Sequence, residues 1–377
     1  MLDLRSPGEF AQGSFPSATN IPLMTDEQRH LVGKCYKTSG QAAAINLGHE
    51  LVSGEQRELL IEQWISFVQE NPAGCLYCFR GGLRSRTVQG WLAERGYEYP
   101  RIDGGYKALR RYLIDSLEQS LQSLPLFVIG GRTGSGKTVL LETLTHHVDL
   151  EALAHHRGSS FGGTTTPQPS NIDFENVLAI EFLRLQEREP GPVFLEDEGR
   201  MIGRVCMPEA LRRTMQSLPV LILEAPLEER IEVSLQAYIV DLQAMYRRSA
   251  PAASDWTDSD DGTRCDPADD RFVQFAAHHR ESLQKIRKRF GGEKTTRALA
   301  LFENALKLQR EQNSLEGYRA YISLLLTEYY DPMYDYQIKT KNRKILLRGN
   351  ASTIRQWIAA QRSDWMQLMV DNRLLPS

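Results

Sequence analysis

Short apolar runs alternate with longer stretches of helical periodicity through the N-terminal part of the chain. Four runs predict buried strands, at 75–78, 125–130, 193–198 and 219–224. Segments 55–71 and 84–95 place apolar residues three or four positions apart and predict helices. Strands that alternate with helices favour an α/β fold with a parallel, doubly wound sheet, whose site lies at the carboxyl ends of its strands.

The pattern changes after about residue 227, where helical periodicity continues to 330. A short apolar strand at 344–348 and a closing helix around Trp357 follow. We therefore predict three segments: an N-terminal α/β domain, the core of a second α/β domain, and a mostly helical C-terminal region that completes the second domain. Their expected bounds are 1–120, 121–226 and 227–377.

Composition adds limits on the class of protein. Hydrophobic residues make up 41% and charged residues 25% of the 377 residues, which is ordinary for a globular protein. No apolar run approaches the ~18 residues of a membrane span, so we expect no membrane association. Five cysteines, an odd number without regular spacing, are typical of a reducing compartment. We expect a cytoplasmic protein.

The run Gly131-Arg-Thr-Gly-Ser-Gly-Lys-Thr138 fits the P-loop pattern G-x-x-x-x-G-K-[ST] between a predicted strand and a predicted helix. Its backbone N–H groups are expected to wrap a diphosphate, while Lys137 neutralises it and the Thr138 hydroxyl holds Mg²⁺. The predicted phosphate-binding residues are Gly131, Gly134, Ser135, Gly136, Lys137 and Thr138.

The apolar run 193–198 ends in acids, as expected of a strand that supports a P-loop metal. Glu196 or Asp197 would orient the water shell of the ion, so Thr138, Glu196 and Asp197 are the candidate Mg²⁺ residues. The alternative is that these acids only end an exposed strand.

A second anion loop lies about fifty residues before the P-loop, in Cys78-Phe-Arg-Gly-Gly-Leu-Arg84-Ser85. A thiol reacts as its thiolate, and loop N–H groups, a helix N-terminus and arginines favour that form. Such a cradle also suits a persulfide, perselenide or phosphoryl adduct on sulfur. The predicted catalytic residues are Cys78, Arg80, Gly81, Gly82 and Arg84, whereas Cys75 is interpreted as a buried strand cysteine.

The cysteine loop, together with Asp3-Leu-Arg-Ser-Pro-Gly-Glu-Phe10 and residues 13–23, resembles the rhodanese superfamily. One spacing differs from many small sulfurtransferases, because Arg84 lies six positions after Cys78. A longer loop of this kind resembles the rhodanese-fold phosphatases and could admit a tetrahedral oxyanion.

A rhodanese-like domain joined to a P-loop NTPase-like domain resembles the tRNA 2-selenouridine synthases. Longer strings carry that resemblance: 33–37, 48–52, 78–85, 104–110, 149–162, 196–203 and 328–334. The resemblance implies a transferase that replaces sulfur by selenium at carbon 2 of wobble 2-thiouridine (U34) in tRNA. It implies selenophosphate and geranyl diphosphate as co-substrates and an S-geranyl-2-thiouridine intermediate. Arg157, within one of these strings, is then a candidate contact for a phosphate donor or for tRNA.

A net charge of −3 means that tRNA must be bound by a local basic patch. Residues 280–289 form the densest candidate, within the helical C-terminal region. The alternative interpretation of this run is a solvated helix face.

Two other classes of function remain open on the sequence. One is a P-loop kinase or NTPase with a regulatory rhodanese domain, and the other is a Cys-x5-Arg phosphatase. Nucleotide turnover that does not depend on Cys78 would favour the first, and phosphatase activity lost in Cys78→Ser would favour the second. Which of the two loops binds selenophosphate also stays open.

Overall fold

The computed structural model describes residues 1–248, 267–340, 343–361 and 365–372. The chain forms two compact units. The first comprises 1–120 and 170–183, and the second comprises 121–169 and 184–377. The structure thus places the predicted segments 121–226 and 227–377 in one unit, apart from 170–183. That short segment joins the first unit, where Arg110 forms an ion pair with Glu175 and a hydrogen bond with Asn176 at 2.7 Å.

The first unit is a small parallel-sheet domain with strand order β2-β1-β3. Its strands are β1 (Leu2–Asp3), β2 (Thr19–Asn20) and β3 (Leu76–Tyr77). Its helices are α1 (Pro7–Ala11), α2 (Asp26–Leu51), α3 (Gly54–Glu70), α4 (Leu83–Glu94) and most of α5 (Gly105–Ser123) and α8 (Asn171–Gln186). Stacked Trp64 and Trp91, with ring centroids 6.2 Å apart, join the core side of α3 to that of α4.

Helix α2 was not predicted from the sequence, because its glycine-punctuated, polar second half shows no apolar stripe. Only Ala44 and Gly48 of its 26 residues are buried, so the hydrophobic period that marks a helix is absent. Thr25 caps its start by accepting a hydrogen bond from the Gln28 N–H. Gly40, with φ of 85°, interrupts the helical backbone.

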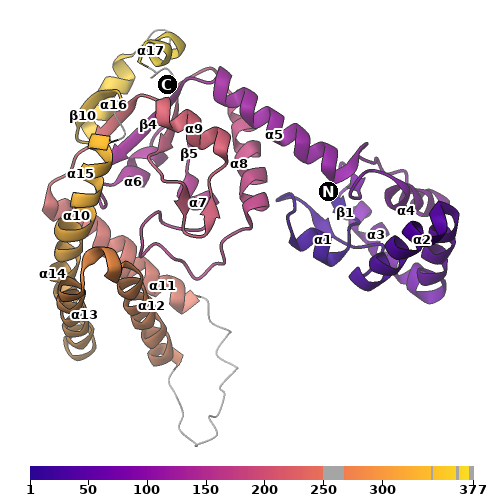
Figure 1. Cartoon of the computed structure of the whole chain (residues 1–377), viewed down its shortest axis with the longest axis horizontal. Coiled ribbons are helices and arrows are strands. Elements are labelled where there is room, and N and C mark those ends of the chain that lie inside the picture. Colours follow the sequence, from indigo (N-terminus) through magenta and orange to yellow (C-terminus); the bar gives the residue numbers. More distant parts are fainter. Residues whose placement is uncertain (249–266, 341–342, 362–364, 373–377) are drawn as a thin grey trace, which may run out of the picture. The chain divides into compact units, whose positions relative to one another are not determined.

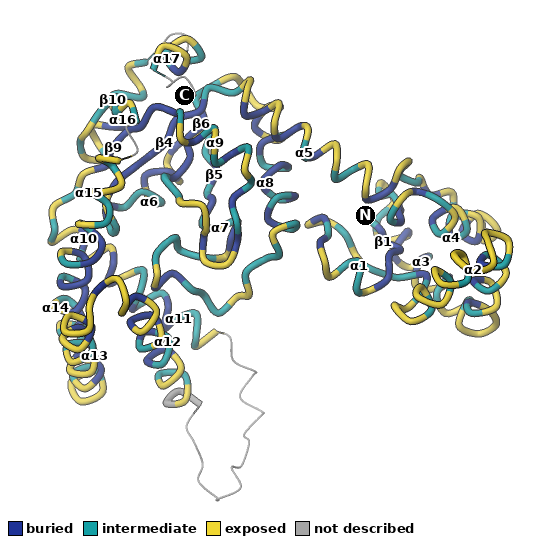
Figure 2. Tube along the Cα trace, viewed as in Figure 1, coloured by how far each residue is buried: buried dark blue, intermediate teal, exposed yellow. Residues whose placement is uncertain are grey.

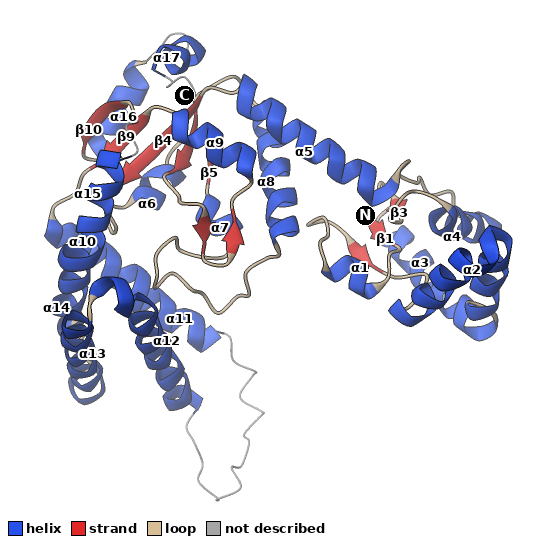
Figure 3. Cartoon of the chain, in the orientation of Figure 1, coloured by secondary structure: helices blue, strands red, loops and turns tan. Residues whose placement is uncertain are grey.

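The second unit contains a five-stranded sheet in the order β10-β9-β4-β6-β5, with every pair parallel. These strands are β4 (Leu126–Gly131), β5 (His147–Val148), β6 (Val193–Glu196), β9 (Val220–Leu223) and β10 (Ile345–Gly349). From β4 the chain builds first one side of the sheet and then the other, so β4 stands at the topological switch point. The predicted doubly wound α/β fold is confirmed (Figures 1 and 3).

Helices and a small hairpin surround this sheet. They are α6 (Lys137–Glu142), α7 (Leu150–Leu153), α9 (Glu209–Ser217), α16 (Ala351–Ala360), α17 (Trp365–Asn372) and the hairpin β7 (Met201–Ile202) and β8 (Val205–Cys206). Strands β4, β6 and β9 are buried along their whole length, as their continuous apolar runs predicted (Figure 2).

The predicted helical C-terminal region is also confirmed. It contains α10 (Leu227–Leu235), η1 (Gln236–Val240), α11 (Asp241–Arg248), α12 (Pro267–Phe290), α13 (Gly292–Gln312), α14 (Glu316–Leu325), η2 (Leu326–Tyr330) and α15 (Asp331–Thr340). Phe275, Phe302, Tyr318 and Tyr321 form its aromatic core. Among the described helices, none combines the length and apolar character that a membrane span requires.

Candidate functional site

Cys78 directly follows β3 and begins the loop that leads into α4. The residue is 2% exposed, and its Sγ donates a hydrogen bond to Ser85 Oγ at 3.3 Å. Ser85 in turn donates to the Gly82 carbonyl oxygen at 3.1 Å. The thiol is therefore held between the loop and the first turn of α4, which is the strand–loop–helix position that the sequence predicted.

The loop after Cys78 is closed by glycines at two points of close backbone approach. Gly81 has φ of 61°, and a Cβ there would lie 2.7 Å from the Gly104 nitrogen and 2.9 Å from the Ile102 carbonyl oxygen. A Cβ on Gly105 would lie 2.2 Å from the Cys78 carbonyl oxygen. Side chains at either position would push the loop away from the 104–105 turn, so these glycines fix the position of the thiol.

A cavity of about 1080 Å³ opens beside Cys78 within the first unit. Its apolar wall includes Leu23, Met24, Val32, Ile45, Val52 and Trp91. Its charged lining is predominantly basic and includes Arg29, Lys34, Lys37, Arg80, Arg84 and the single acid Glu9. Cavities of this order bind organic ligands, and here an apolar wall and cations converge on one thiol.

The two arginines predicted to assist Cys78 have different environments. Arg84 is paired with Glu9 at 2.6 Å, and Arg29 contacts the same carboxylate at 3.0 Å. Burial alone would raise the pKa of Glu9, but the hydrogen bond and charge of Arg84, together with the Ser6 N–H and the charge of Arg29, lower that pKa below its usual value. Arg80 is exposed and forms no ion pair with the described residues. Of these two arginines, Arg80 is thus the one that is available to a ligand.

The P-loop connects the switch-point strand β4 to α6. Lys137 Nζ donates to the Gly131 carbonyl oxygen at 3.1 Å, and Thr138 Oγ1 donates to Glu196 Oε1 at 2.7 Å. Gly134, with φ of 79°, passes close to α10, where a Cβ would lie 2.6 Å from the Arg230 carbonyl oxygen. The loop therefore folds around its own lysine, and the motif residues lie together as predicted.

Three carboxyl groups gather beside the P-loop. One oxygen each from Glu151, Glu196 and Glu198 lies within 4.8 Å of the other two. Burial raises the pKa of Glu196 to about 7 despite the nearby Lys137 charge. Burial, followed by the like charges of Glu196 and Glu198, raises the pKa of Glu151, and burial also raises that of Glu198. The three carboxyl groups therefore either hold protons or bind a cation that offsets their negative charge.

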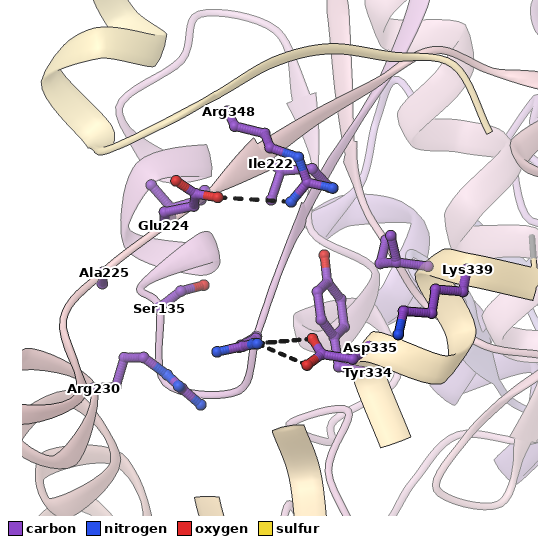
Figure 4. A pocket seen from close by; sticks show the side chains of 12 residues that line it. Ser135, Ile222, Glu224, Ala225, Arg230, Tyr334, Asp335, Lys339 and Arg348 are labelled. Carbon is purple, nitrogen blue, oxygen red and sulfur yellow. Dashed lines mark hydrogen bonds and ion pairs between the residues drawn. The ribbon is translucent and has the colours of Figure 1, made fainter. Parts of the chain in front are cut away.

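A second cavity, of about 450 Å³, adjoins the P-loop at Arg132 and Ser135 (Figure 4). Its apolar lining comes from Ile222, Leu223, Ala225, Tyr334 and Ile338. Its cations are Arg132, Arg230, Lys339 and Arg348, of which Arg348 faces Glu224 at 3.6 Å in the close-up view. The cavity thus offers an apolar surface to the organic part of a phosphate ester.

Two predicted site residues point elsewhere. The Asp197 carboxylate pairs with Arg343, with both side chains buried, so it is held apart from the carboxyl cluster. Arg157 donates to the Ala237 carbonyl oxygen and contacts Asp241 at 3.2 Å. Its guanidinium is engaged in packing within the second unit rather than directed to the P-loop.

Glu151 and Glu198 were not among the predicted site residues. Glu198 lies two positions beyond Glu196, within the same run of acids. Glu151 follows β5, a strand of two residues that is too short to give a clear apolar pattern. An acid two or three positions beyond the end of a strand was the signal in both cases, and at Glu151 the strand itself was not predicted.

Proteins with sequences similar to this chain belong to a family that contains a P-loop domain. Residues 124–364 match the family described as the tRNA 2-selenouridine synthase AAA domain. The tRNA 2-selenouridine synthase of Marinobacter nauticus is 48% identical over 96% of this chain and 95% of its own length. The chain belongs to the tRNA 2-selenouridine synthase family.

Two further members of the family show the same coverage. The tRNA 2-selenouridine synthase of Sulfurovum sp. (strain NBC37-1) is 43% identical over 96% of this chain and 95% of its own length. That of Pseudomonas fluorescens is 46% identical over 95% of this chain and 94% of its own length. The similarity therefore includes both units, the cysteine loop as well as the P-loop.

Proposed function

We propose that this protein converts 2-thiouridine at the wobble position of tRNA to 2-selenouridine. Family membership over nearly the whole chain supports this function. The observation that carries it is the presence in one chain of a buried, cradled Cys78 at a basic-rimmed cavity and of a complete P-loop. The wobble base lies in a single-stranded loop, so it can enter a protein pocket without the breaking of a helix.

The P-loop unit would carry out the first step, transfer of a geranyl group from geranyl diphosphate to sulfur. The thiocarbonyl sulfur attacks the first carbon of the geranyl chain, the carbon–oxygen bond breaks, and the diphosphate leaves with its electron pair. The N3 proton of the base is released, which leaves the alkylated base neutral. Lys137, which donates to the Gly131 carbonyl, is placed to turn to the diphosphate. The 450 Å³ cavity beside Arg132 and Ser135 offers apolar surface for the hydrocarbon chain.

Mg²⁺ fits this side of the sheet through the chemistry of its donors. Thr138 and Glu196 present hydroxyl and carboxylate oxygens at 2.7 Å from each other, and one Glu196 oxygen remains buried without a hydrogen-bond partner in the described chain. A bound Mg²⁺ would supply positive charge to the departing diphosphate. Asp197, the third candidate ligand, is instead paired with Arg343.

The Cys78 unit would carry out the second step, replacement of the alkylated sulfur by selenium from selenophosphate. Alkylation makes the sulfur a better leaving group, so the selenium of selenophosphate attacks carbon 2 and geranyl thiol departs. Water then cleaves the phosphorus–selenium bond, which releases phosphate and leaves selenium on carbon 2. The exposed Arg80 is placed to attract the anionic donor, and Cys78 lies at the wall of the same cavity. We expect the Cys78 thiolate to act on the selenium donor and to deliver it to carbon 2.

For tRNA, basic residues are available in each unit. Arg287, Lys288 and Arg289 are exposed at the C-terminal end of α12, whereas Arg280 of the same run is paired with Glu303 at 2.7 Å. In the first unit, Lys34 and Lys37 are exposed at the Cys78 cavity. We propose that the α12 residues contact the phosphate backbone, as their density along one helix suggests.

The test is a nucleoside mass spectrum of tRNA from cells that lack this protein, complemented with defined variants. Wild type should restore 2-selenouridine, and Cys78→Ser should not. Lys137→Ala should lower S-geranyl-2-thiouridine. Restoration of normal 2-selenouridine levels by Cys78→Ser would refute the role of Cys78, and absence of 2-selenouridine with wild type would refute the proposed function.

A further inference from the structure

We propose that Glu151, Glu196 and Glu198 form a divalent-cation site that is loaded before any diphosphate binds. The role of this cation in catalysis rests on the proposed function of the P-loop. Binding of the cation does not depend on that function. The site differs from the one suggested by the sequence, because Glu151 and Glu198 supply the carboxylates in place of Asp197.

The topology of the sheet brings these residues together. Strands β5, β6 and β4 are neighbours in the sheet, and they are parallel. Glu151 follows the carboxyl end of β5, Glu196 ends β6, and the P-loop with Thr138 follows β4. Three adjacent strand ends therefore converge on one point, with one oxygen from each of the three glutamates within 4.8 Å of the others.

A buried, unsatisfied oxygen points to a missing partner at this place. Glu196 is fully buried, and its Oε1 accepts the Thr138 hydroxyl. Its Oε2 is buried and has no hydrogen-bond partner among the described residues. A buried carboxylate oxygen without a partner is costly, and a cation would satisfy it without any rearrangement of the fold.

The charge at this point is also unbalanced. Lys137 is the cation whose field lowers the pKa of all three carboxyl groups, and its Nζ is already bonded to the Gly131 carbonyl oxygen. A divalent ion would relieve the repulsion among Glu151, Glu196 and Glu198.

Local backbone structure keeps the space around the cluster narrow. A Cβ on Gly158 would lie 2.2 Å from Glu151 Oε1 and 2.6 Å from Glu198 Oε1, so a side chain there would displace both carboxylates. Glycine at this position lets the 157–163 loop pass over the cluster. The loop and the three carboxylates thus form a built site rather than an exposed acidic patch.

The donor set selects the kind of ion. All the candidate ligands are oxygen atoms, from three carboxylates and the Thr138 hydroxyl. Hard cations such as Mg²⁺ and Mn²⁺ prefer such ligands, whereas zinc and copper sites use nitrogen or sulfur more often. We therefore expect Mg²⁺ or Mn²⁺, with water completing the coordination.

The test is a titration of the full chain, first freed of metal by a chelator, with Mn²⁺ in the absence of any diphosphate. The electron paramagnetic resonance signal of free Mn²⁺ reports the amount bound. Wild type should bind one ion, and Glu151→Gln and Glu198→Gln should each weaken binding by roughly tenfold or more. The control variant is Glu142→Gln, at an exposed position on α6, and it should bind as wild type does.

The thermal unfolding temperature of each variant, measured without metal, shows whether a variant that fails to bind Mn²⁺ is still folded. Glutamine retains the shape of the side chain and removes a repelling charge, so both variants should unfold at or above the wild-type temperature. The proposal is overturned if folded wild type binds Mn²⁺ only when inorganic diphosphate is present, or if folded Glu151→Gln and Glu198→Gln bind as tightly as wild type. A proton shared between Glu151 and Glu198, which are hydrogen-bonded to each other, would then hold the cluster together.

The experiment also distinguishes failure of the cation site from failure of the proposed function. If Mn²⁺ binds at the cluster but Lys137→Ala forms S-geranyl-2-thiouridine normally, the cation site stands and the assignment of geranyl diphosphate to the P-loop falls.

Discussion

Carboxylates near Cys78 are paired with arginines, whereas three carboxylates at the carboxyl edge of the P-loop sheet have no such partner among the described residues. Near Cys78, the partly buried Glu9 pairs with Arg84 at 2.6 Å, and the buried Asp3 pairs with Arg5 at 2.7 Å. Beside the P-loop, Glu151, Glu196 and Glu198 converge without enough positive charge to balance them. The first site keeps positive charge at Arg80 that no described residue pairs, and so suits an anion, whereas the second needs a cation.

Among the variants that test this difference between the two regions, the largest effect is expected from replacement of Cys78. Cys78→Ser should lower 2-selenouridine in tRNA below detection, because a hydroxyl, which stays protonated at neutral pH, cannot replace the thiolate that we expect to act on the selenium donor. S-geranyl-2-thiouridine should accumulate, since the P-loop unit is unchanged. Nucleoside mass spectrometry measures both products.

Cys75 provides the matched control for that measurement. It lies in the same chain segment but outside the loop, and burial raises the pKa of its thiol, which disfavours the reactive thiolate. Cys75→Ser should therefore be nearly silent. Equal loss of 2-selenouridine in the two variants would show that the segment matters for folding rather than Cys78 for chemistry.

The next largest effect is expected in Lys137→Ala. Removal of a charged hydrogen bond to the diphosphate should cost about 1.5–3 kcal/mol, or about 10- to 100-fold in S-geranyl-2-thiouridine formation. Single-turnover assays with geranyl diphosphate and 2-thiouridine tRNA measure this rate. Lys307→Ala, at an exposed position on α13, is the control and should react as wild type does.

If Lys137→Ala geranylates normally but fails to add selenium, the two loops have been assigned to the wrong steps. That outcome would leave the family assignment intact, because the overall reaction needs both steps.

The pH dependence of stability should differ in sign between the two regions. Glu9 has a lowered pKa in the fold, so its pairing with Arg84 stabilises the first unit above the ordinary carboxyl pKa and is lost as pH falls through the folded value. Glu196 has a pKa raised to about 7, so its ionisation should destabilise the second unit as pH rises from about 4.5 towards 7.

Hydrogen exchange of peptides from each unit, followed from pH 4 to 8 without metal, checks both signs. Protection in the β6 and α7 segments should fall as pH rises, and Mg²⁺ should restore it. Protection around α1 and α4 should rise over the acidic part of the range. If protection changes with pH in the same direction in both units, the two regions do not differ in the sign of their pH dependence.

The smallest expected effect concerns tRNA. Replacement of Arg287, Lys288 and Arg289 by Glu should weaken tRNA binding and flatten its salt dependence, by roughly 0.9 in the log–log slope for each phosphate that the helix no longer neutralises. Fluorescence anisotropy at several salt concentrations measures the slope. Replacement of Lys34 and Lys37 by Glu provides the matched comparison at the Cys78 cavity. An unchanged slope in the α12 variant, with a flatter slope in the other, would place the tRNA backbone on the first unit.

Much of the fold was readable from the sequence because the core strands are fully buried. Continuous apolar runs at 125–130, 193–198 and 219–224 appear as β4, β6 and β9, and the P-loop and cysteine loop appear where those patterns place them. Helix α2 and strand β5 were missed. The first buries too little surface to impose a period, and the second is only two residues long.

The sequence by itself determined where the two candidate loops lie, the cysteine loop that begins at Cys78 and the P-loop of 131–138, since each is contained in a short contiguous motif. Only the tertiary structure decided which acids accompany the P-loop. Asp197 and Glu198 are adjacent in sequence, yet one pairs with Arg343 and the other joins Glu151 and Glu196. Successive residues leave a strand end in different directions, and the partner of each depends on the order of strands in the sheet, which no local pattern records.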